Sequence, residues 1–323
     1  MITTRFTERF GVEVPIMQAP IGGLSDAKLA TAVCNAGALG AFQALHPTGD
    51  TDWFTRELDG LRAGTTQPFA VGFITAFLPF VPERFDIALE RGVPVIAFSF
   101  GDPSPYIERA HASGAKVICQ VQTLAHARVA VDAGADAIAA QGTEAGGHTG
   151  TMGLLPLLGS VLDAFPDVPV LAAGGVGNGR TLAGVLAMGA DGAWMGSAFL
   201  ATREATVDER WKELIVGSDG TDTVWTQTFD IVSGRPWPEG IGARVHANKF
   251  TQRWNGRVDD LRARAGEVKF SEEFDPDESA VYYGQSAALV HGVRPVAQVV
   301  SDIVGDAERY LTRAASDRDR PAG

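Results

Sequence analysis

The sequence predicts an α/β protein built on a (β/α)8 barrel, the TIM-barrel fold, followed by a smaller and mainly helical part. Three observations support this prediction. Short apolar runs recur through the first two hundred residues, glycine precedes most of them, and the intervals between these glycines are regular. Strands that read as continuous apolar runs are covered on both faces, as in a parallel sheet. Eight strand–helix units in about 200 residues is the number that this barrel requires.

The first four predicted strands lie within the first hundred residues. They are "VPIMQAP" (14–20), the end of "CNAGALGAF" (34–42), "PFAVGFI" (68–74) and the end of "LERGVPVIAFSF" (89–100). Gly37 and Gly92 stand where a helix would end, and glycine adopts the left-handed conformation there without a Cβ clash. The 55 residues between these two glycines suit two strand–helix units.

The next four predicted strands follow the same rhythm. They lie in "HASGAKVICQV" (111–121), "VDAGADAIAAQG" (131–142), "VPVLAAGG" (168–175) and "LAMGADGAWMG" (186–196). An open doubly wound sheet explains the pattern less well, because no "GxGxxG" follows the first strand. The segment "GGVGNGR" (174–180) follows a late strand and has Arg180 where the third glycine would be.

Charged and aromatic residues become frequent after Thr202. We therefore divide the chain into a barrel at 1–202 and a mainly helical substrate or cap domain at 203–323. The segment 277–293 is expected to be helical. The segment 294–315 has apolar residues at helical spacing after Pro295, so it is expected to form a C-terminal helix that returns to the barrel.

Composition argues against several classes of partner. The chain has 323 residues and a net charge of −12, whereas a protein that reads a nucleic-acid backbone needs a basic face. Membrane association is not expected either, since the longest apolar run, near 69–81, is shorter than the roughly 20 residues of a membrane span. Two cysteines and no zinc-like spacing predict no metal site, and a reducing cytoplasm is the expected location. The polar N-terminus is not expected to be a signal peptide.

The active site of a (β/α)8 barrel lies at the carboxyl ends of its strands. Gly174 and Gly175, then Gly196 and Ser197, directly follow the seventh and eighth predicted strands. Phosphate groups commonly bind there to backbone N–H groups. We therefore favour a site for a phosphorylated ligand over the alternative that these glycines only form turns. No lysine lies at these strand ends and no Walker motif is present, which argues against Schiff-base and ATP chemistry.

His148 is the candidate catalytic residue. It follows the sixth predicted strand in the glycine-rich segment "AAQGTEAGGHTG" (139–150), on the side of the expected phosphate site. Imidazole titrates near neutral pH, so it can take or return a substrate proton. Glu144 in the same segment is interpreted as a cap or loop-organising carboxylate.

Four motifs then carry a resemblance to a known family: "PIMQAPIGG" (15–23), "AQGTEAGGHTG" (140–150), "LAAGGVGNGR" (171–180) and "GADGAWMGSAFLAT" (189–202). In this order they resemble the nitronate monooxygenases, formerly called 2-nitropropane dioxygenases, over nearly the whole chain. Similar relatives on this scaffold include FMN-dependent quinone reductases and flavin-dependent enoyl reductases.

The resemblance implies a noncovalently bound FMN at the carboxyl ends of the strands. Its phosphate would bind to Gly174, Gly175, Gly196 and Ser197. It also implies FMN contacts from Ala19, Pro20, Gly72, Gln120, Gln141, Gly146 and Gly147. The substrate pocket would include Tyr282, Tyr283, Gln285 and Ser286, although the two tyrosines could equally pack between the two parts of the chain.

The implied activity is oxidation of alkyl nitronates or nitroalkanes with O2 to a carbonyl compound and nitrite, with His148 as the base. An NAD(P)H-dependent reductase of quinones or of enoyl or acyl-CoA thioesters is the alternative. An isomerase or lyase of sugar phosphates without flavin and a noncatalytic binding protein are further readings of the same barrel. A homodimer is left open, since barrels of this type often pair.

Overall fold

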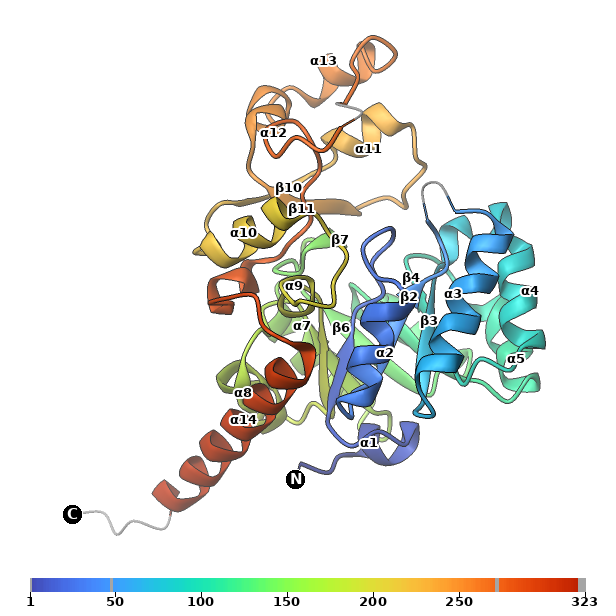
Figure 1. Cartoon of the computed structure of the whole chain (residues 1–323), viewed down its shortest axis with the longest axis vertical. Helices are drawn as coiled ribbons and strands as arrows, with labels where there is room; N and C mark the ends of the chain where they lie inside the picture. The colour runs from blue at the N-terminus through green and yellow to red at the C-terminus, as the bar shows by residue number, and fades with distance from the viewer. Residues whose placement is uncertain (1, 47–48, 271–272, 319–323) are drawn as a thin grey trace.

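The computed structural model describes residues 2–46, 49–270 and 273–318. Its main element is a parallel sheet whose strands, in chain order, are β1 (Ile16–Gln18), β2 (Gly40–Gln43), β3 (Phe69–Ile74), β4 (Val95–Ser99), β5 (Lys116–Val121), β6 (Ala137–Gln141), β8 (Val170–Ala173) and β9 (Gly192–Met195). The spatial order is β1-β9-β8-β6-β5-β4-β3-β2. The end strands also meet, because Met17 bridges Leu39 and Gln18 N donates to the Leu39 carbonyl at 2.9 Å. The sheet therefore closes into the predicted TIM barrel (Figure 1).

Helices precede, separate and follow the strands of the barrel. They are α1 (Arg5–Phe10), α2 (Ala27–Asn35), α3 (Thr51–Gly64), the short 3-10 helix η1 (Thr75–Phe80), α4 (Pro82–Glu90), α5 (Ser104–Ala112), α6 (Leu124–Asp132), α7 (Leu154–Ala164), α8 (Gly179–Ala187) and α9 (Ser197–Leu200). The five glycines that precede strands, Gly37, Gly92, Gly114, Gly134 and Gly189, all have φ between 61° and 103°. The predicted left-handed helix ends are therefore confirmed.

Helix α1 covers the amino-terminal end of the barrel. Phe6 and Phe10 are buried and pack with interior residues such as Met17 and Leu39. This packing closes one end with apolar side chains, so a ligand can enter only at the carboxyl ends of the strands.

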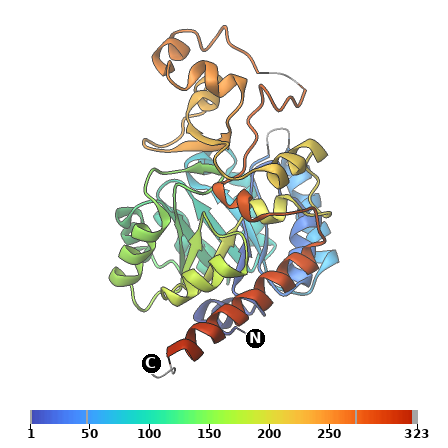
Figure 2. The ribbon, with the colours of Figure 1, turned by 90° about the vertical axis from the view of Figure 1, so that its left-hand side faces the viewer.

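The chain after Thr202 lies mainly over that open end (Figure 2). It contains α10 (Glu209–Gly217), β10 (Thr223–Thr226), α11 (Thr228–Ser233), β11 (Gly242–His246), α12 (Lys249–Trp254), α13 (Val258–Ala263), the 3-10 helix η2 (Gln285–Leu289) and α14 (Val296–Arg318). A small antiparallel sheet, β10-β11-β7, joins it to the barrel, since β7 (Gly147–Thr149) belongs to the segment after β6. The boundary at residues 202 and 203 stays a prediction.

The prediction of a helix over 277–293 is wrong. Its backbone groups instead bond to distant parts of the chain: His246 N donates to the Val281 carbonyl at 2.8 Å, and Gly284 N donates to Ser197 Oγ at 3.0 Å. These partners satisfy polar groups that a helix would otherwise pair internally, so only the short η2 turn forms. The segment therefore runs largely extended across the barrel mouth.

Helix α14 forms as predicted and packs against α8 and α2 of the barrel. The contact is close at Gly179, where an added Cβ would lie 2.3 Å from Asp306 Cβ and 2.5 Å from the Ile303 carbonyl oxygen. Arg180 Nη2 donates to the Tyr310 hydroxyl at 2.7 Å. The "GNGR" stretch therefore serves helix packing. In the described part of the chain, no helix combines the length and hydropathy of a membrane span.

Candidate active site

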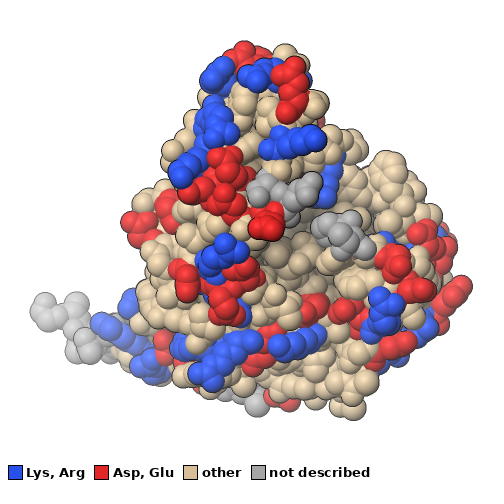
Figure 3. Space-filling view, turned by 45° about the horizontal axis from the view of Figure 1, so that its top comes forward, with Lys and Arg blue, Asp and Glu red and all other residues tan. Residues whose placement is uncertain are grey.

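A cavity of about 490 Å³ lies at the carboxyl ends of the barrel strands, beneath the segment that follows Thr202. Figure 3 shows the corresponding hollow, with mainly uncharged side chains around it. Most of the residues predicted for the site line this cavity: Ala19, Pro20, Gln120, Gln141, Gly146, Gly147, His148, Gly174, Gly196, Ser197, Tyr282, Tyr283 and Ser286. Four motifs far apart in the sequence therefore meet at one place.

Three predicted residues lie outside the lining. Gly72 is behind Pro20, where an added Cβ would be 2.6 Å from the proline ring, so it lets Pro20 sit close to β3. Gly175 lies between two lining residues, Gly174 and Val176. Gln285 is exposed, and its backbone N–H donates to the Glu144 carbonyl at 3.0 Å.

The loops after β8 and β9 present backbone donors to the cavity. Gly174 and Gly175 have φ of 91° and 69°. Within the described residues, the N–H groups of Gly175 and Val176 donate to no protein acceptor. Such N–H groups beside glycines are suited to an anion such as a phosphate.

The glutamines at the strand ends differ in their hydrogen bonding. The Oε1 atoms of Gln120 and Gln43 are buried and accept no hydrogen bond from any described residue. Gln141 is engaged, because its Oε1 accepts from Gln122 Nε2 and its Nε2 donates to the His148 carbonyl, both at 2.9 Å. Gln141 therefore supports β7, whereas Gln120 and Gln43 keep an acceptor for a bound molecule. Sequence reasoning missed Gln43, although a polar residue at the end of a buried strand is the signal for it.

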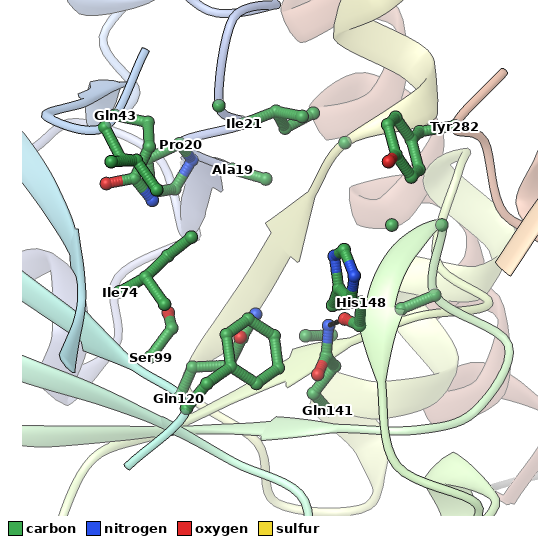
Figure 4. Close-up of a pocket in the computed structure, with 18 of the residues that line it drawn as sticks. Ala19, Pro20, Ile21, Gln43, Ile74, Ser99, Gln120, Gln141, His148 and Tyr282 are labelled. Carbon is green, nitrogen blue, oxygen red and sulfur yellow. Dashed lines mark hydrogen bonds between the residues drawn. The ribbon is translucent and has the colours of Figure 1, made fainter. Parts of the chain in front are cut away.

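His148 lies on β7, which is paired with β11 through the register His148–Ala243, so the glycine-rich segment forms a short strand at this point. Its Nε2 contacts both carboxylate oxygens of Asp230, at 2.9 and 3.1 Å. The two side chains are only 11% and 12% exposed. Figure 4 shows the imidazole beside Tyr282 and above Gln141.

An aromatic wall completes the surroundings of His148. The Trp237 ring stacks on the imidazole with 3.5 Å between centroids and 14° between planes. Phe100 contacts Trp237 edge-on at 5.3 Å. Among the described non-glycine residues Phe100 alone has a positive φ, 58°, and such strained conformations cluster at functional sites. Sequence reasoning assigned no role to Asp230 or to Trp237, which lies in the segment "SGRPWPEGIGARV" (233–245).

The two tyrosines have different roles in packing. The Tyr283 hydroxyl donates to Asp222 Oδ2 at 2.7 Å and lies 2.7 Å from His246 Nδ1, which ties β10 and β11 to the cavity wall. Burial, with a contribution from the charge of Asp230, raises the pKa of Tyr282 to about 12. The Tyr282 hydroxyl is therefore protonated at neutral pH.

The cavity carries little charge. Of its lining residues in the described ranges, Arg235 at the mouth is the sole Lys, Arg, Asp or Glu. His46 also belongs to the lining, and burial lowers its pKa, which favours the neutral ring.

Glu144 acts as a helix cap. Its two carboxylate oxygens lie 3.1 and 3.0 Å from the backbone nitrogen of Leu154, the first residue of α7. The interpretation of Glu144 as a cap is therefore confirmed.

Replacing Glu144 with alanine should lower the free energy of unfolding by about 1 kcal/mol, because the Leu154 N–H loses its acceptor. Glu144→Gln keeps an acceptor oxygen and is the matched control, with a smaller loss. Urea unfolding at pH 7 measures both. Equal losses in the two variants would contradict the capping role.

The chain is similar to several known proteins. The family model described as nitronate monooxygenase matches residues 3–306. A relative from Mycobacterium tuberculosis, named (3aS,4S,5R,7aS)-5-hydroxy-7a-methyl-1-oxo-octahydro-1H-indene-4-carboxyl-CoA dehydrogenase, is 38% identical over 224 residues. That alignment covers 68% of this chain and 62% of the relative, so less than two thirds of the relative's length is matched.

Two solved structures are similar over nearly their whole length. FabK from Thermotoga maritima has a TM-score of 0.88 at 30% identity, with 98% of this chain and 99% of that chain covered. A nitroalkane oxidase from Streptomyces ansochromogenes has a TM-score of 0.79 at 30% identity, with 96% and 99% covered.

Proposed function

The chain belongs to the nitronate monooxygenase family of oxidoreductases, and we propose that it oxidises alkyl nitronates or nitroalkanes with O2 in an FMN-dependent reaction. The observation that carries the proposal is the position of His148. It is a nearly buried imidazole at the edge of a cavity whose lining contains no lysine and no carboxylate in the described residues. In the described part of the lining the other imidazole is that of His46, which is a weaker base because burial lowers its pKa. This leaves His148 as the group best placed to move a proton.

The residues around the cavity fit an FMN. The unpaired N–H groups of Gly175 and Val176, together with Gly196 and Ser197, would hold the phosphate. Ala19 and Pro20 would contact the ring, and the unpaired oxygen of Gln120 would accept a hydrogen bond from it or from the ribityl chain. Gln43 offers a second unpaired oxygen on the same wall.

In this proposal His148 removes the α-proton of a neutral nitroalkane, and the electron pair of the C–H bond moves onto the nitro group to give the nitronate. A substrate that is already a nitronate needs no such step. The apolar walls, including Phe77 and Phe100, keep water away from the anion. The redox chemistry would come from the bound FMN, with O2 as oxidant and a carbonyl compound and nitrite as products.

A reductase of quinones or of enoyl or acyl-CoA thioesters, driven by NAD(P)H, is the second candidate. Two observations favour it: the similarity to a CoA-thioester dehydrogenase, and Arg235 at the cavity mouth, where a cation could meet the phosphates of a nucleotide. The cytoplasmic location and the homodimer stay predictions.

An anaerobic absorbance titration separates the two candidates. The purified protein is titrated separately with propionate 3-nitronate, NADH and NADPH while the flavin band is followed. We expect bleaching by the nitronate and none by either nicotinamide. Bleaching by NADH or NADPH alone would contradict the oxygenase and favour the reductase, and a protein that binds no flavin would contradict both.

A further inference from the structure

The contact between His148 and Asp230 crosses 82 positions of the sequence and joins the two parts of the chain. His148 lies on β7, next to the barrel, whereas Asp230 lies in α11 of the segment that covers the barrel mouth. Of the ion pairs among the described residues, Asp230 takes part only in the one with His148. Removing a carboxylate from water costs free energy, and among the described residues His148 is the one ion-pair partner that offsets this cost for Asp230.

We propose that Asp230 is a positioning residue that fixes His148 in the tautomer with hydrogen on Nε2, so that Nδ1 is the atom that accepts the substrate proton. A carboxylate only accepts hydrogen bonds, so the Nε2 atom 2.9 Å away must be the donor. The other ring nitrogen then carries the lone pair. Nδ1 forms no hydrogen bond with any residue that the structure describes. This inference rests on the proposed role of His148 as the base.

The same covering segment also restrains the ring plane. Trp237 follows α11 and stacks on the imidazole, so the ring is held at one edge by Asp230 and on one face by Trp237. The base is thus complete only when residues 228–241 lie against β7. The negative charge of Asp230 also stabilises the imidazolium that forms when Nδ1 takes the proton.

The α C–H bond breaks, its electron pair stays on the substrate as nitronate, and the proton forms a bond to Nδ1. Asp230 takes up no proton, and its hydrogen bond from Nε2 is kept throughout.

The first test reads the tautomer directly. Protein with 15N-labelled histidine is studied by proton–nitrogen NMR, and His148→Gln identifies the His148 signals. We expect a protonated Nε2 and an unprotonated Nδ1 in the unaltered protein. Asp230→Leu, which has a similar volume and no acceptor, should give a mixture of tautomers. Unchanged His148 signals in Asp230→Leu would overturn the proposal, and this readout does not depend on turnover.

The second test is kinetic, with the FMN-loaded enzyme. Asp230→Leu should lower turnover of neutral nitroalkanes by about 10²-fold or more, and turnover of preformed nitronates far less, since only the former need the base. Asp230→Asn keeps the shape of the side chain and so guards against a variant that fails to fold. Its amide can also donate to Nε2 and favour the other tautomer, so it should show the same selective loss on neutral nitroalkanes. Glu239→Leu, an exposed carboxylate of the same segment, is the matched control and should match the unaltered enzyme.

Equal loss on both substrate classes would overturn the positioning role. The failure of the proposed base looks different. In that case His148→Ala would retain nitroalkane turnover, whereas a failure of positioning alone would leave His148→Ala impaired and Asp230→Leu active.

Discussion

Replacing His148 with alanine is expected to lower turnover of neutral nitroalkanes by about 10²–10⁴-fold, the range usual for loss of a general base. Turnover of preformed nitronates should fall much less, because the α-proton is already gone. The expected asymmetry follows from the cavity, whose lining offers no carboxylate or lysine in the described ranges to replace the imidazole. Steady-state rates with nitroethane and with its nitronate at the same pH measure it.

His126→Ala is the matched control for His148→Ala, since His126 is an exposed histidine on α6, away from the cavity lining. It should leave both rates unchanged. Equal losses on nitroalkane and nitronate in His148→Ala would contradict the base role and indicate a part in binding. A primary isotope effect with α-deuterated substrate should persist in the variant, because proton removal then limits the rate more strongly.

The barrel could be predicted because its signal is local and repeated. A glycine such as Gly114 or Gly134 must take a positive φ where a helix ends, and an apolar strand follows at once. Residues 277–293 show where local reasoning fails. The segment was expected to be helical, but its backbone groups bond to His246, Ser197 and Glu144, which are distant in sequence. No pattern within the segment reveals such partners.

Some residues of the site could likewise be predicted from local sequence signals, and others could not. His148 and the glycines around the cavity follow strands, so their position in the sequence already placed them at the barrel mouth. Asp230 and Trp237 reach His148 only because β11 pairs with β7. These two strands are far apart in the sequence, and no local pattern predicts that they pair. Gln141 lines the cavity, and its amide also bonds to Gln122 and to the His148 carbonyl, partners that the sequence did not reveal.

Substitution of the adjacent glycines Gly146 and Gly147, in "AGGH" (145–148), is expected to have the second large effect, on stability and flavin binding. An added Cβ on Gly146 would lie 2.4 Å from Gly284 N and from the Tyr283 carbonyl carbon, and these backbone atoms cannot move aside cheaply. Gly147 differs, because a Cβ there meets nothing within 4 Å, although its φ of 73° disfavours other residues. A larger residue is therefore disfavoured at Gly146 by contact with neighbouring backbone atoms, and at Gly147 only by the backbone conformation.

Gly146→Ala should therefore lower the free energy of unfolding by about 3 kcal/mol or more, whereas Gly147→Ala should cost about 1–2 kcal/mol. Because the extended segment at Tyr283–Gly284 forms one wall of the cavity, pushing it outward should also weaken flavin binding in Gly146→Ala. Urea unfolding and the flavin-to-protein ratio after gel filtration measure the two effects. Equal behaviour of the two variants would mean that the backbone contact at Gly146 does not hold the wall, and that the shape of the cavity depends instead on the β7–β11 pairing.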